Sequence, residues 1–260
     1  MVVADLHVHT DNSDGTLALE EVPGAAREAG VEVVAVTDHD RLNPELSAPV
    51  VHPQGVTLVH GIELRVDAGF GKVDLLGYAA RRTEALGAEC ERIQRDRVER
   101  AGRIVDLVES ETSAELDIDL QPGVGRPHIA RAIEDSDAGY SYREAFEELI
   151  GDDGPCYVPR DVPGFERGRD LLQEACGLVG LAHPLRYDEP ERALALCESL
   201  DAVELHYPYG REVDSRPVEK AIERYDLVVT GGSDAHEREL GLAGLSRAEY
   251  RAFRERVDLG

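Results

Sequence analysis

The histidines of this chain stand in short motifs together with carboxylates. His7 and His9 form an H-x-H pair after the first apolar run, and His39 lies within Thr37-Asp38-His39-Asp40. Alternate residues of a strand point to the same side, so the two imidazoles of the H-x-H pair can face one point. The full candidate set has eight members: His7, His9, Asp14, His39, Glu63, His183, Asp234 and His236.

Imidazole and carboxylate groups together suit zinc, manganese or iron(II). One tetrahedral ion takes about four ligands, so the set is large enough for two or three ions that share a bridging carboxylate. Ions about 3.5–4 Å apart suit phosphoester hydrolysis, because they activate water and stabilise both the attacking and the leaving oxygens. A lone histidine after a strand is usually a packing or hydrogen-bonding residue. The interpretation therefore depends on the whole set meeting at one place.

Each candidate lies at or just beyond the carboxyl end of an expected strand. Apolar runs predict seven strands, over residues 2–7, 31–37, 56–62, 73–78, 178–183, 202–207 and 227–230. Helical patterns separate several of them, such as residues 17–29, which end at Gly30. This alternation predicts parallel strands with crossover helices. In a closed α/β barrel such strand ends converge on one rim, where active sites are built. Gly69-Phe70-Gly71 indicates a hairpin turn rather than a phosphate loop, because no helix start follows it.

One stretch interrupts the alternation. A long helical pattern begins near residue 84, and a Pro- and Gly-rich turn region follows at residues 121–127. Two shorter helical patterns lie near residues 129–134 and 142–150, and no strong strand pattern accompanies them. We expect a helical insertion at residues 84–162, between the fourth and fifth strands, in a barrel made of residues 1–83 and 163–260. An ordinary helical layer of a single domain is the alternative.

The charge of the chain is strongly acidic. It has 53 acidic and 28 basic residues, a formal net charge of −25, and Lys72 and Lys220 as its only lysines. This composition favours a halophilic protein adapted to high salt, with an ordinary acidic cytosolic protein as the alternative. The negative field disfavours stable binding of duplex nucleic acid, although local arginines or metals can still bind a small anion.

The compartment is predicted from what the sequence does not contain. The four cysteines are far apart, which favours a reducing cytoplasm over a disulfide framework or a zinc ribbon. No apolar run approaches the roughly 18 residues that a membrane span needs, and the start has no basic segment typical of a signal peptide. We therefore expect a cytoplasmic protein without a membrane partner.

The motifs resemble those of the PHP (polymerase and histidinol phosphatase) superfamily. The resemblance covers nearly the whole chain, in order: Asp5-Leu6-His7-Val8-His9-Thr10, Ser13-Asp14-Gly15-Thr16, Thr37-Asp38-His39-Asp40, Gly61-Ile62-Glu63 and Ser233-Asp234-Ala235-His236. It implies a distorted (β/α)7 barrel, in agreement with the seven expected strands. It also implies a phosphoesterase site with two or three divalent ions, of manganese, zinc or iron.

The resemblance also implies a ligand for each ion. It assigns His7, His9, Glu63 and Asp234 to one ion and Asp14, His39 and His236 to a second. Glu63 bridges to a third ion, which His183 also binds. Asp74 stands where similar proteins usually carry a histidine before Leu-Leu-Gly-Tyr. An aspartate can bind a hard or borderline ion, but it changes the net charge and the metal preference of the third site.

Two motifs of the insertion resemble the branch that contains the 3′,5′-nucleoside bisphosphatases, which overlaps with 5′-to-3′ exoribonucleases of short RNA. They are Gly125-Arg126-Pro127-His128-Ile129-Ala130 and Tyr157-Val158-Pro159-Arg160. The resemblance suggests that Arg126, His128 and Arg160 face the barrel mouth, and an arginine fork matches phosphate oxygens. A surface ion pair is the alternative for each arginine. Arg186, just after His183-Pro184, is a further candidate for binding substrate.

We therefore expect a metal-dependent phosphoesterase in which a metal-bridging hydroxide attacks the phosphorus of a small nucleotide or short oligonucleotide. His39, Asp234 and His236 are its candidate catalytic residues, and His236 or His128 is the candidate proton donor to the leaving oxygen. One alternative is a histidinol-phosphate phosphatase. A catalytically silent, metal-loaded module that binds a partner is the alternative outside enzymes.

The acidic composition predicts how the protein responds to salt. We expect its thermal midpoint and its activity to hold or rise between dilute buffer and molar KCl, because salt screens the repulsion among the carboxylates. Melting curves recorded across a KCl series check this. Higher stability in dilute buffer than in molar KCl would contradict it.

Overall fold

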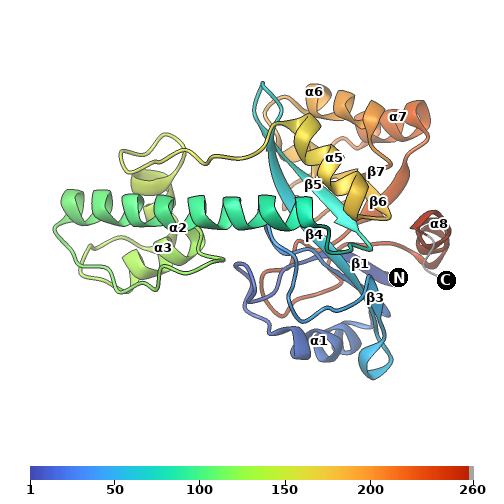
Figure 1. Ribbon diagram of the computed structural model, residues 1–260, viewed down its shortest axis with the longest axis horizontal. Coiled ribbons are helices and arrows are strands. Elements are labelled where there is room, and N and C mark those ends of the chain that lie inside the picture. Colours follow the sequence, from blue (N-terminus) through green and yellow to red (C-terminus); the bar gives the residue numbers. More distant parts are fainter. Residues whose placement is uncertain (258–260) are drawn as a thin grey trace. The chain divides into compact units, whose positions relative to one another are not determined.

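The computed structural model describes residues 1–257 (Figure 1). The chain forms two compact units. One, called here the barrel unit, contains residues 1–90 and the described residues from 162 onward. The other, called here the insertion unit, contains residues 91–161.

The barrel unit contains one nearly closed sheet. Its strands are β1 (Ala4–Val8), β2 (Val33–Val36), β3 (Val50–Val51), β4 (Thr57–Asp67), β5 (Lys72–Tyr78), β6 (Leu178–Leu181), β7 (Ala202–His206) and β8 (Val228–Gly231). The order is β1-β2-β4-β5-β6-β7-β8, with the short β3 paired antiparallel to β4. A parallel bridge between Val8 and Ala235 joins the two ends of this order. The predicted seven-stranded α/β barrel is confirmed, and β3 is an addition that the sequence did not predict.

The expectation that all strands are parallel is wrong for β5, which runs antiparallel to both β4 and β6. Residues 68–71 join β4 to β5, and the Ala68 amide donates a hydrogen bond to the Gly71 carbonyl. A link this short permits a hairpin but not a crossover helix. We expected Glu63 at the end of a strand, but it lies inside β4, which continues to Asp67 before the hairpin turn.

Helices cover the outside of the barrel (Figure 1). They are α1 (Val22–Ala29), α5 (Phe165–Ala175), α6 (Pro190–Ala195), α7 (Arg216–Tyr225) and α8 (Arg247–Val257). Helix α5 packs on β4, β5 and β6, while α7 packs on β7 and α8 on β8. Helix α1 ends where Gly30 adopts the left-handed conformation at φ 72°, which glycine adopts without a steric cost. On α8, Phe253 packs edge-on against the buried Tyr78 ring at 5.2 Å.

The insertion unit is helical and has its own apolar core. Its elements are most of α2 (Glu84–Thr112), then α3 (Arg126–Glu134), α4 (Tyr142–Glu144) and a π-helical turn (Ala145–Ile150). Ile104 and Val108 of α2 pack with Ile129 and Ile133 of α3 and with Leu149. A core of this kind allows the segment to keep its structure without contributing a strand to the barrel sheet.

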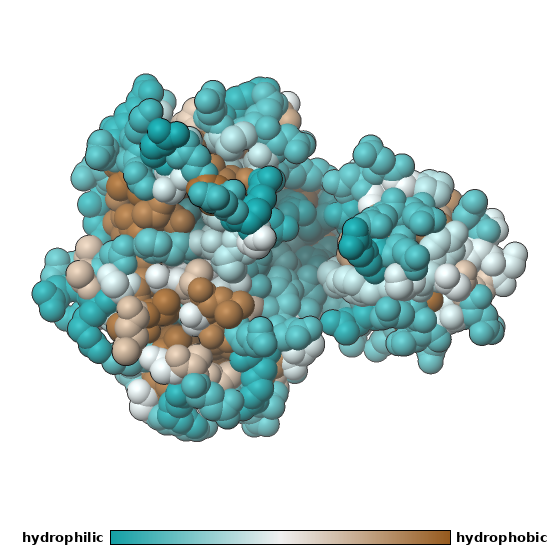
Figure 2. Space-filling model, turned by 180° about the vertical axis from the view of Figure 1, so that it is seen from behind, coloured by the Kyte–Doolittle hydropathy of each residue, from teal (hydrophilic) through white to brown (hydrophobic). Residues whose placement is uncertain are grey.

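The surface on one face of the molecule is mainly hydrophilic. Figure 2 shows a face on which hydrophilic residues predominate, with apolar residues exposed only in patches. Within residues 1–257, no helix combines the length and the apolar character that crossing a membrane requires.

We expect the hydrogen bonds of the buried Asp5 carboxylate to stabilise the fold. Its buried carboxylate accepts hydrogen bonds from the Ser233 amide (2.9 Å), the Ser233 hydroxyl (2.6 Å) and the Gly241 amide (2.8 Å). Asp5→Ala leaves these donors unpaired, so we expect a loss of about 2–4 kcal/mol in unfolding free energy, measured in urea. Asp5→Asn should lose less, and Glu223→Ala on the exposed side of α7 should change nothing. Equal stability of Asp5→Ala and the parent would contradict this role.

Candidate metal centre

The barrel brings the eight ligand candidates to one rim. His7 lies in β1 and His9 just after it, while Asp234 and His236 follow β8. His39, after β2, forms a parallel bridge with Glu63, so the middle of β4 lies at the level where β2 ends. Glu63 therefore reaches the rim from mid-strand.

Asp74 also reaches this rim, from the first half of β5. Because β5 is antiparallel to its neighbours, its beginning lies where the parallel strands end. Asp74 is directly paired with Arg65 in the β4–β5 register.

Two buried carboxylates beside the ligands organise the loops, and the sequence analysis did not identify them. Asp38 accepts hydrogen bonds from the Thr10 amide (2.7 Å) and the Ser13 hydroxyl (2.9 Å), which orders the loop that carries Asp14. Asp5 connects β1 to the loop that carries Asp234. Asp38 directly precedes His39, and Asp5 lies two residues before His7. This spacing to a motif histidine was the sequence signal that could have identified them.

Three overlapping groups of side chains place ligand atoms within 4.8 Å of one another: His9, Asp14, His39 and His236; His7, His9, Glu63 and Asp234; and Glu63, Asp74 and His183. His9 belongs to the first two groups and Glu63 to the last two. The structure therefore brings together all nine residues predicted as metal ligands.

Glu63 is the side chain that links the groups. One carboxylate oxygen lies 2.7 Å from His39 Nδ1 and 3.4 Å from His9 Nε2. Its other oxygen lies 3.0 Å from His183 Nε2 and 3.5 Å from His7 Nε2. The carboxylate is 1% exposed, so these contacts form in a region of weak solvent screening.

Glu204 orients two of the histidines and was missed by the sequence analysis. One carboxylate oxygen lies 3.1 Å from His7 Nδ1, and the other accepts a hydrogen bond from the His183 amide at 2.7 Å. With Nδ1 against Glu204, the His7 ring places Nε2 3.5 Å from both Glu63 and Asp234. Metal-binding histidines are commonly held in this way by a carboxylate.

The charges of the rim shift one another's pKa values. Burial opposes ionisation of Glu63, yet the imidazoles of His39 and His7 outweigh it and hold the carboxyl pKa well below its usual range. Burial likewise opposes charge on His7, but Glu204, Glu63 and Asp234 raise the pKa of its imidazole. Burial and the neighbouring His39 and His236 lower the pKa of His9. Carboxylates that stay ionised beside a neutral imidazole form a donor set suited to divalent cations.

Several ligand atoms are buried without a hydrogen-bond partner, which tests whether the residues fit metal ions. Within residues 1–257, no such partner is found for His7 Nε2, His9 Nδ1 or Asp14 Oδ1. Buried polar atoms are otherwise almost always paired, because an unpaired one costs about 1–3 kcal/mol. The first two groups thus combine unpaired donors with imidazole and carboxylate ligands, and they fit divalent ions.

Two of the ligand candidates have strained backbones. His183 has φ 28° and Asp234 has φ 51°, in the left-handed region that side chains other than glycine rarely adopt. Such strain costs about 1–3 kcal/mol and is maintained at functional sites by the surrounding structure. Here the hydrogen bond from the His183 amide to Glu204 helps to maintain it.

Arg186 lies beside the second group. Its Nη1 donates to Asp234 Oδ2 at 3.2 Å and to the Tyr207 hydroxyl at 2.8 Å, and that hydroxyl donates to the same Asp234 oxygen at 2.7 Å. The Arg186 side chain is 53% exposed, so a positive charge next to a ligand candidate remains accessible to an anion.

Arg126, His128 and Arg160 belong to the insertion unit. Arg126 donates to Asp152 at 2.6 Å, which is the ion pair considered as its alternative, and His128 Nδ1 accepts from the Gly125 amide at the start of α3. Their predicted role at the barrel mouth stays a prediction.

These arginines are part of a larger group, called here the arginine group: Arg97, Arg100, Arg126 and Arg160. Arg97 and Arg100 are each 5% exposed. Burial and the charges of Arg126 and Arg160 lower the pKa of Arg100 to about 10. Arg97 and Arg100 were missed, because their positions in a long helical pattern gave no sign that they lie near the other two.

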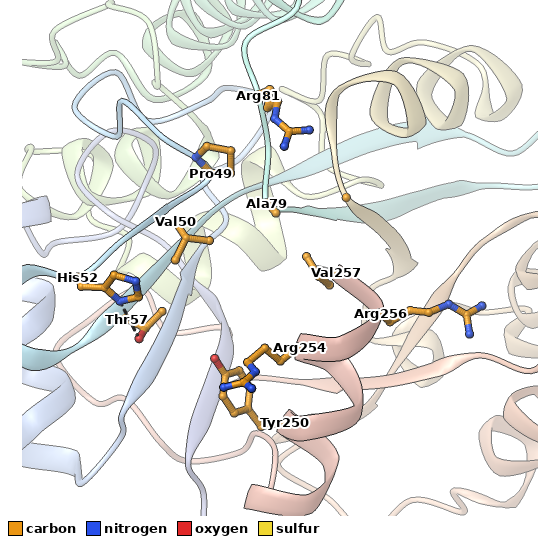
Figure 3. A pocket seen from close by; sticks show the side chains of 11 residues that line it. Pro49, Val50, His52, Thr57, Ala79, Arg81, Tyr250, Arg254, Arg256 and Val257 are labelled. Carbon is orange, nitrogen blue, oxygen red and sulfur yellow. Dashed lines mark hydrogen bonds between the residues drawn. The ribbon is translucent and has the colours of Figure 1, made fainter. Parts of the chain in front are cut away.

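A separate pocket of about 620 Å³ has a different character (Figure 3). It is lined by residues near the start of β4 and the end of β5, and by residues of α8, including Thr57, Ala79, Tyr250 and Arg254. Arg256 points away from the other labelled side chains and lies 3.9 Å from Asp226. None of the predicted site residues lines this pocket.

The fold and the centre together define a metal-dependent hydrolase of phosphoric esters. The PHP domain model matches residues 5–150, more than half of the chain. The chain belongs to the PHP domain family, as the motifs indicated.

The relatives act on phosphate esters. The chain is 31% identical to a phosphoribosyl 1,2-cyclic phosphate 1,2-diphosphodiesterase of Eggerthella lenta, over 90% of this chain and 94% of that protein. It is 30% identical to a 3′,5′-nucleoside bisphosphate phosphatase of Chromobacterium violaceum, over 72% of this chain and 69% of the relative. It is also 26% identical to the 5′-3′ exoribonuclease Rnm of Escherichia coli, over 72% and 67% of the two chains.

Solved structures agree on the fold. A candidate metal-dependent phosphoesterase of Bifidobacterium adolescentis has a TM-score of 0.82 and 25% identity, covering 98% of this chain and 96% of that one. A Chromobacterium violaceum protein described as an amidohydrolase has a TM-score of 0.78 and 24% identity, over 97% of this chain and 96% of that one.

We expect Glu204 to increase metal affinity, because it holds the His7 ring in place. Glu204→Gln removes the charge that fixes the His7 ring, so we expect divalent ions to bind about 10- to 100-fold more weakly. Competition with a chromogenic chelator measures this affinity, and Glu223→Gln on the surface of α7 is the matched control. Unchanged affinity in Glu204→Gln would show that His7 needs no such support.

Proposed function

We propose that this phosphoesterase hydrolyses a small nucleotide, either a nucleoside 3′,5′-bisphosphate or a short 5′-phosphorylated oligonucleotide. The observation that carries the proposal is the linkage of three ligand groups through His9 and Glu63 at one rim. We further propose two or three divalent ions, of manganese, zinc or iron, as its cofactors.

The first two groups would hold the ions. Divalent ions bound there would lower the pKa of water, and they would offset negative charge that develops on the phosphoryl oxygens. His7 would serve as a ligand through Nε2, because Glu204 occupies its Nδ1.

His236 is better suited to bind metal than to donate a proton. Its Nδ1 donates to the Asp234 carbonyl at 2.9 Å, and its Nε2 faces the Asp14 carboxylate at 3.4 Å, as it would across a shared ion. A ring nitrogen that binds an ion has no proton to give to the leaving oxygen. We therefore assign His236, with His39 and Asp234, to the metal centre.

Arg186 would orient the scissile phosphate. Its guanidinium is fixed by Asp234 and Tyr207, yet half of the side chain is exposed. A fixed cation beside the reacting centre favours the correct position of a phosphoryl group and stabilises its charge.

The arginine group supports a substrate with more than one phosphate. The charges of Arg126 and Arg160 act on the almost fully buried Arg100, so the group concentrates positive charge, which favours an anion. We propose that this group, in an insertion domain of residues 84–162, binds a second phosphate of the substrate, with His128 as a further contact. Histidinol phosphate has only one phosphate, so it has no second phosphate for the arginine group to bind.

A phosphoribosyl cyclic phosphate is the second candidate substrate. The Eggerthella lenta relative named for this activity matches 94% of its own length, compared with 69% for the nucleoside bisphosphatase. The three named relatives share a substrate built on ribose phosphate, so both candidates carry phosphate groups on a ribose.

We expect substitutions of the ligand candidates His39 and Asp234 to abolish activity. His39→Ala and Asp234→Asn each remove a ligand candidate, so we expect turnover to be lost in the presence of excess Mn²⁺. Wild-type rates for purified His39→Ala under controlled metal would overturn the mechanism. Arg216→Met on the surface is the control and should act like the parent.

Arg186 predicts an effect on substrate binding. Arg186→Met removes a charged hydrogen-bond donor, so we expect KM to rise about 10-fold or more, since such a bond contributes about 1.5–3 kcal/mol. Parallel assays with adenosine 3′,5′-bisphosphate, a short 5′-phosphorylated RNA, phosphoribosyl 1,2-cyclic phosphate and histidinol phosphate compare the substrates. Highest kcat/KM on histidinol phosphate would overturn the proposed nucleotide substrate.

A further inference from the structure

The third ligand group differs from the other two because an arginine already binds one of its carboxylates, that of Asp74. Asp74, 1% exposed, receives a bidentate contact from Arg65, with Nε at 2.7 Å from Oδ1 and Nη2 at 2.6 Å from Oδ2. Both oxygens that could bind an ion are therefore already neutralised by a guanidinium. Such a planar fork is among the strongest charged contacts a protein makes.

The guanidinium is held in this position by the strands. Arg65 and Asp74 are directly opposite in the antiparallel β4–β5 register. The Arg65 amide also donates to Asp40 Oδ1 at 3.0 Å, which fixes its backbone. Arg65 lies two residues after Glu63, so both side chains leave β4 on the same side. The positive charge thus lies on the same side of β4 as Glu63, which belongs to the second and third groups.

The remaining members of the group leave little for a third ion. His183 Nε2 lies 3.0 Å from Glu63 and 3.7 Å from Asp74 Oδ2. An ion there would have to take Asp74 from Arg65 and then lie close to a fixed like charge. Without Asp74 it would have only Glu63 and His183, fewer than the about four ligands of a closed site.

We propose that Arg65 takes the place of a third cation, so that the protein binds two ions tightly and carries a guanidinium where a third ion would be. The proposal rests on the proposed metal centre but not on the substrate assigned to it. It gives Arg65, which the sequence analysis did not single out, the role of setting the number of ions.

Metal counting tests the proposal without any substrate. The protein is equilibrated with Mn²⁺, freed of unbound ion by gel filtration, and analysed for manganese per chain. We expect two ions in the parent and three in Arg65→Met, which keeps an unbranched apolar stem but removes the guanidinium and its charge. Three tightly bound ions in the parent, or two in Arg65→Met, would overturn the proposal.

Further variants locate the additional ion. The double variant Arg65→Met/Asp74→Ala should return to two ions, because the carboxylate of the third group is gone. Arg216→Met breaks a bidentate pair with Asp214 on the surface and should keep two ions. A third ion in the double variant would place it elsewhere and would contradict the proposal.

Melting curves provide a second test, because they measure how much bound metal stabilises the folded protein. Arg65→Met leaves Asp74 buried without a partner, so its melting temperature without metal should fall. Added Mn²⁺ should raise it by more than it raises that of the parent, because an ion then neutralises Asp74. An equal rise in both would count against the proposal. A parent that binds no Mn²⁺ would overturn the proposed metal centre as well, whereas a two-ion parent without hydrolysis would overturn only the substrate.

Discussion

The buried carboxylate of Glu63 is the interaction on which the centre depends. Four imidazoles lie within 3.5 Å of its two oxygens, and solvent hardly reaches them. In so poorly screened a region every charge must be balanced, so the positions of the neighbouring acids and bases are mutually determined. Glu204 and Asp5 are part of this balance, because they orient His7 and the loop that carries Asp234. Bound cations would complete it.

The reversal of β5 has the largest consequence for the chemistry of the rim. A short hairpin makes this strand antiparallel, and its first residues then lie where the parallel strands end. Asp74 enters the centre by this route, with Arg65 opposite it. The same hairpin therefore supplies both a ligand and the cation that neutralises that ligand.

Arginines carry the positive charge of this acidic chain at selected places. Many of them pair with carboxylates on the surface, as Arg216 does with Asp214. Arg65 and Arg186 instead contact carboxylates of the centre, and the arginine group concentrates charge within the insertion unit. Lysine could not replace them equally, because only a guanidinium forms a planar fork on a carboxylate or phosphate. Local positive charge thus exists within a strongly negative field.

The sequence alone determined the family and the seven main strands, and it predicted the helical segment and the residues of the ligand groups. These follow from local patterns: the types of residue, their spacing and the ends of apolar runs. It could not determine that β4 continues past Glu63 or that Arg65 lies on Asp74, although Gly69-Phe70-Gly71 already indicated the hairpin that makes β5 antiparallel. Nor could it place Glu204 against His7 or gather Arg97 and Arg100 with Arg126. Those facts are set by strand register and by contacts between residues far apart in the chain, which exist only when the barrel and the insertion unit are folded.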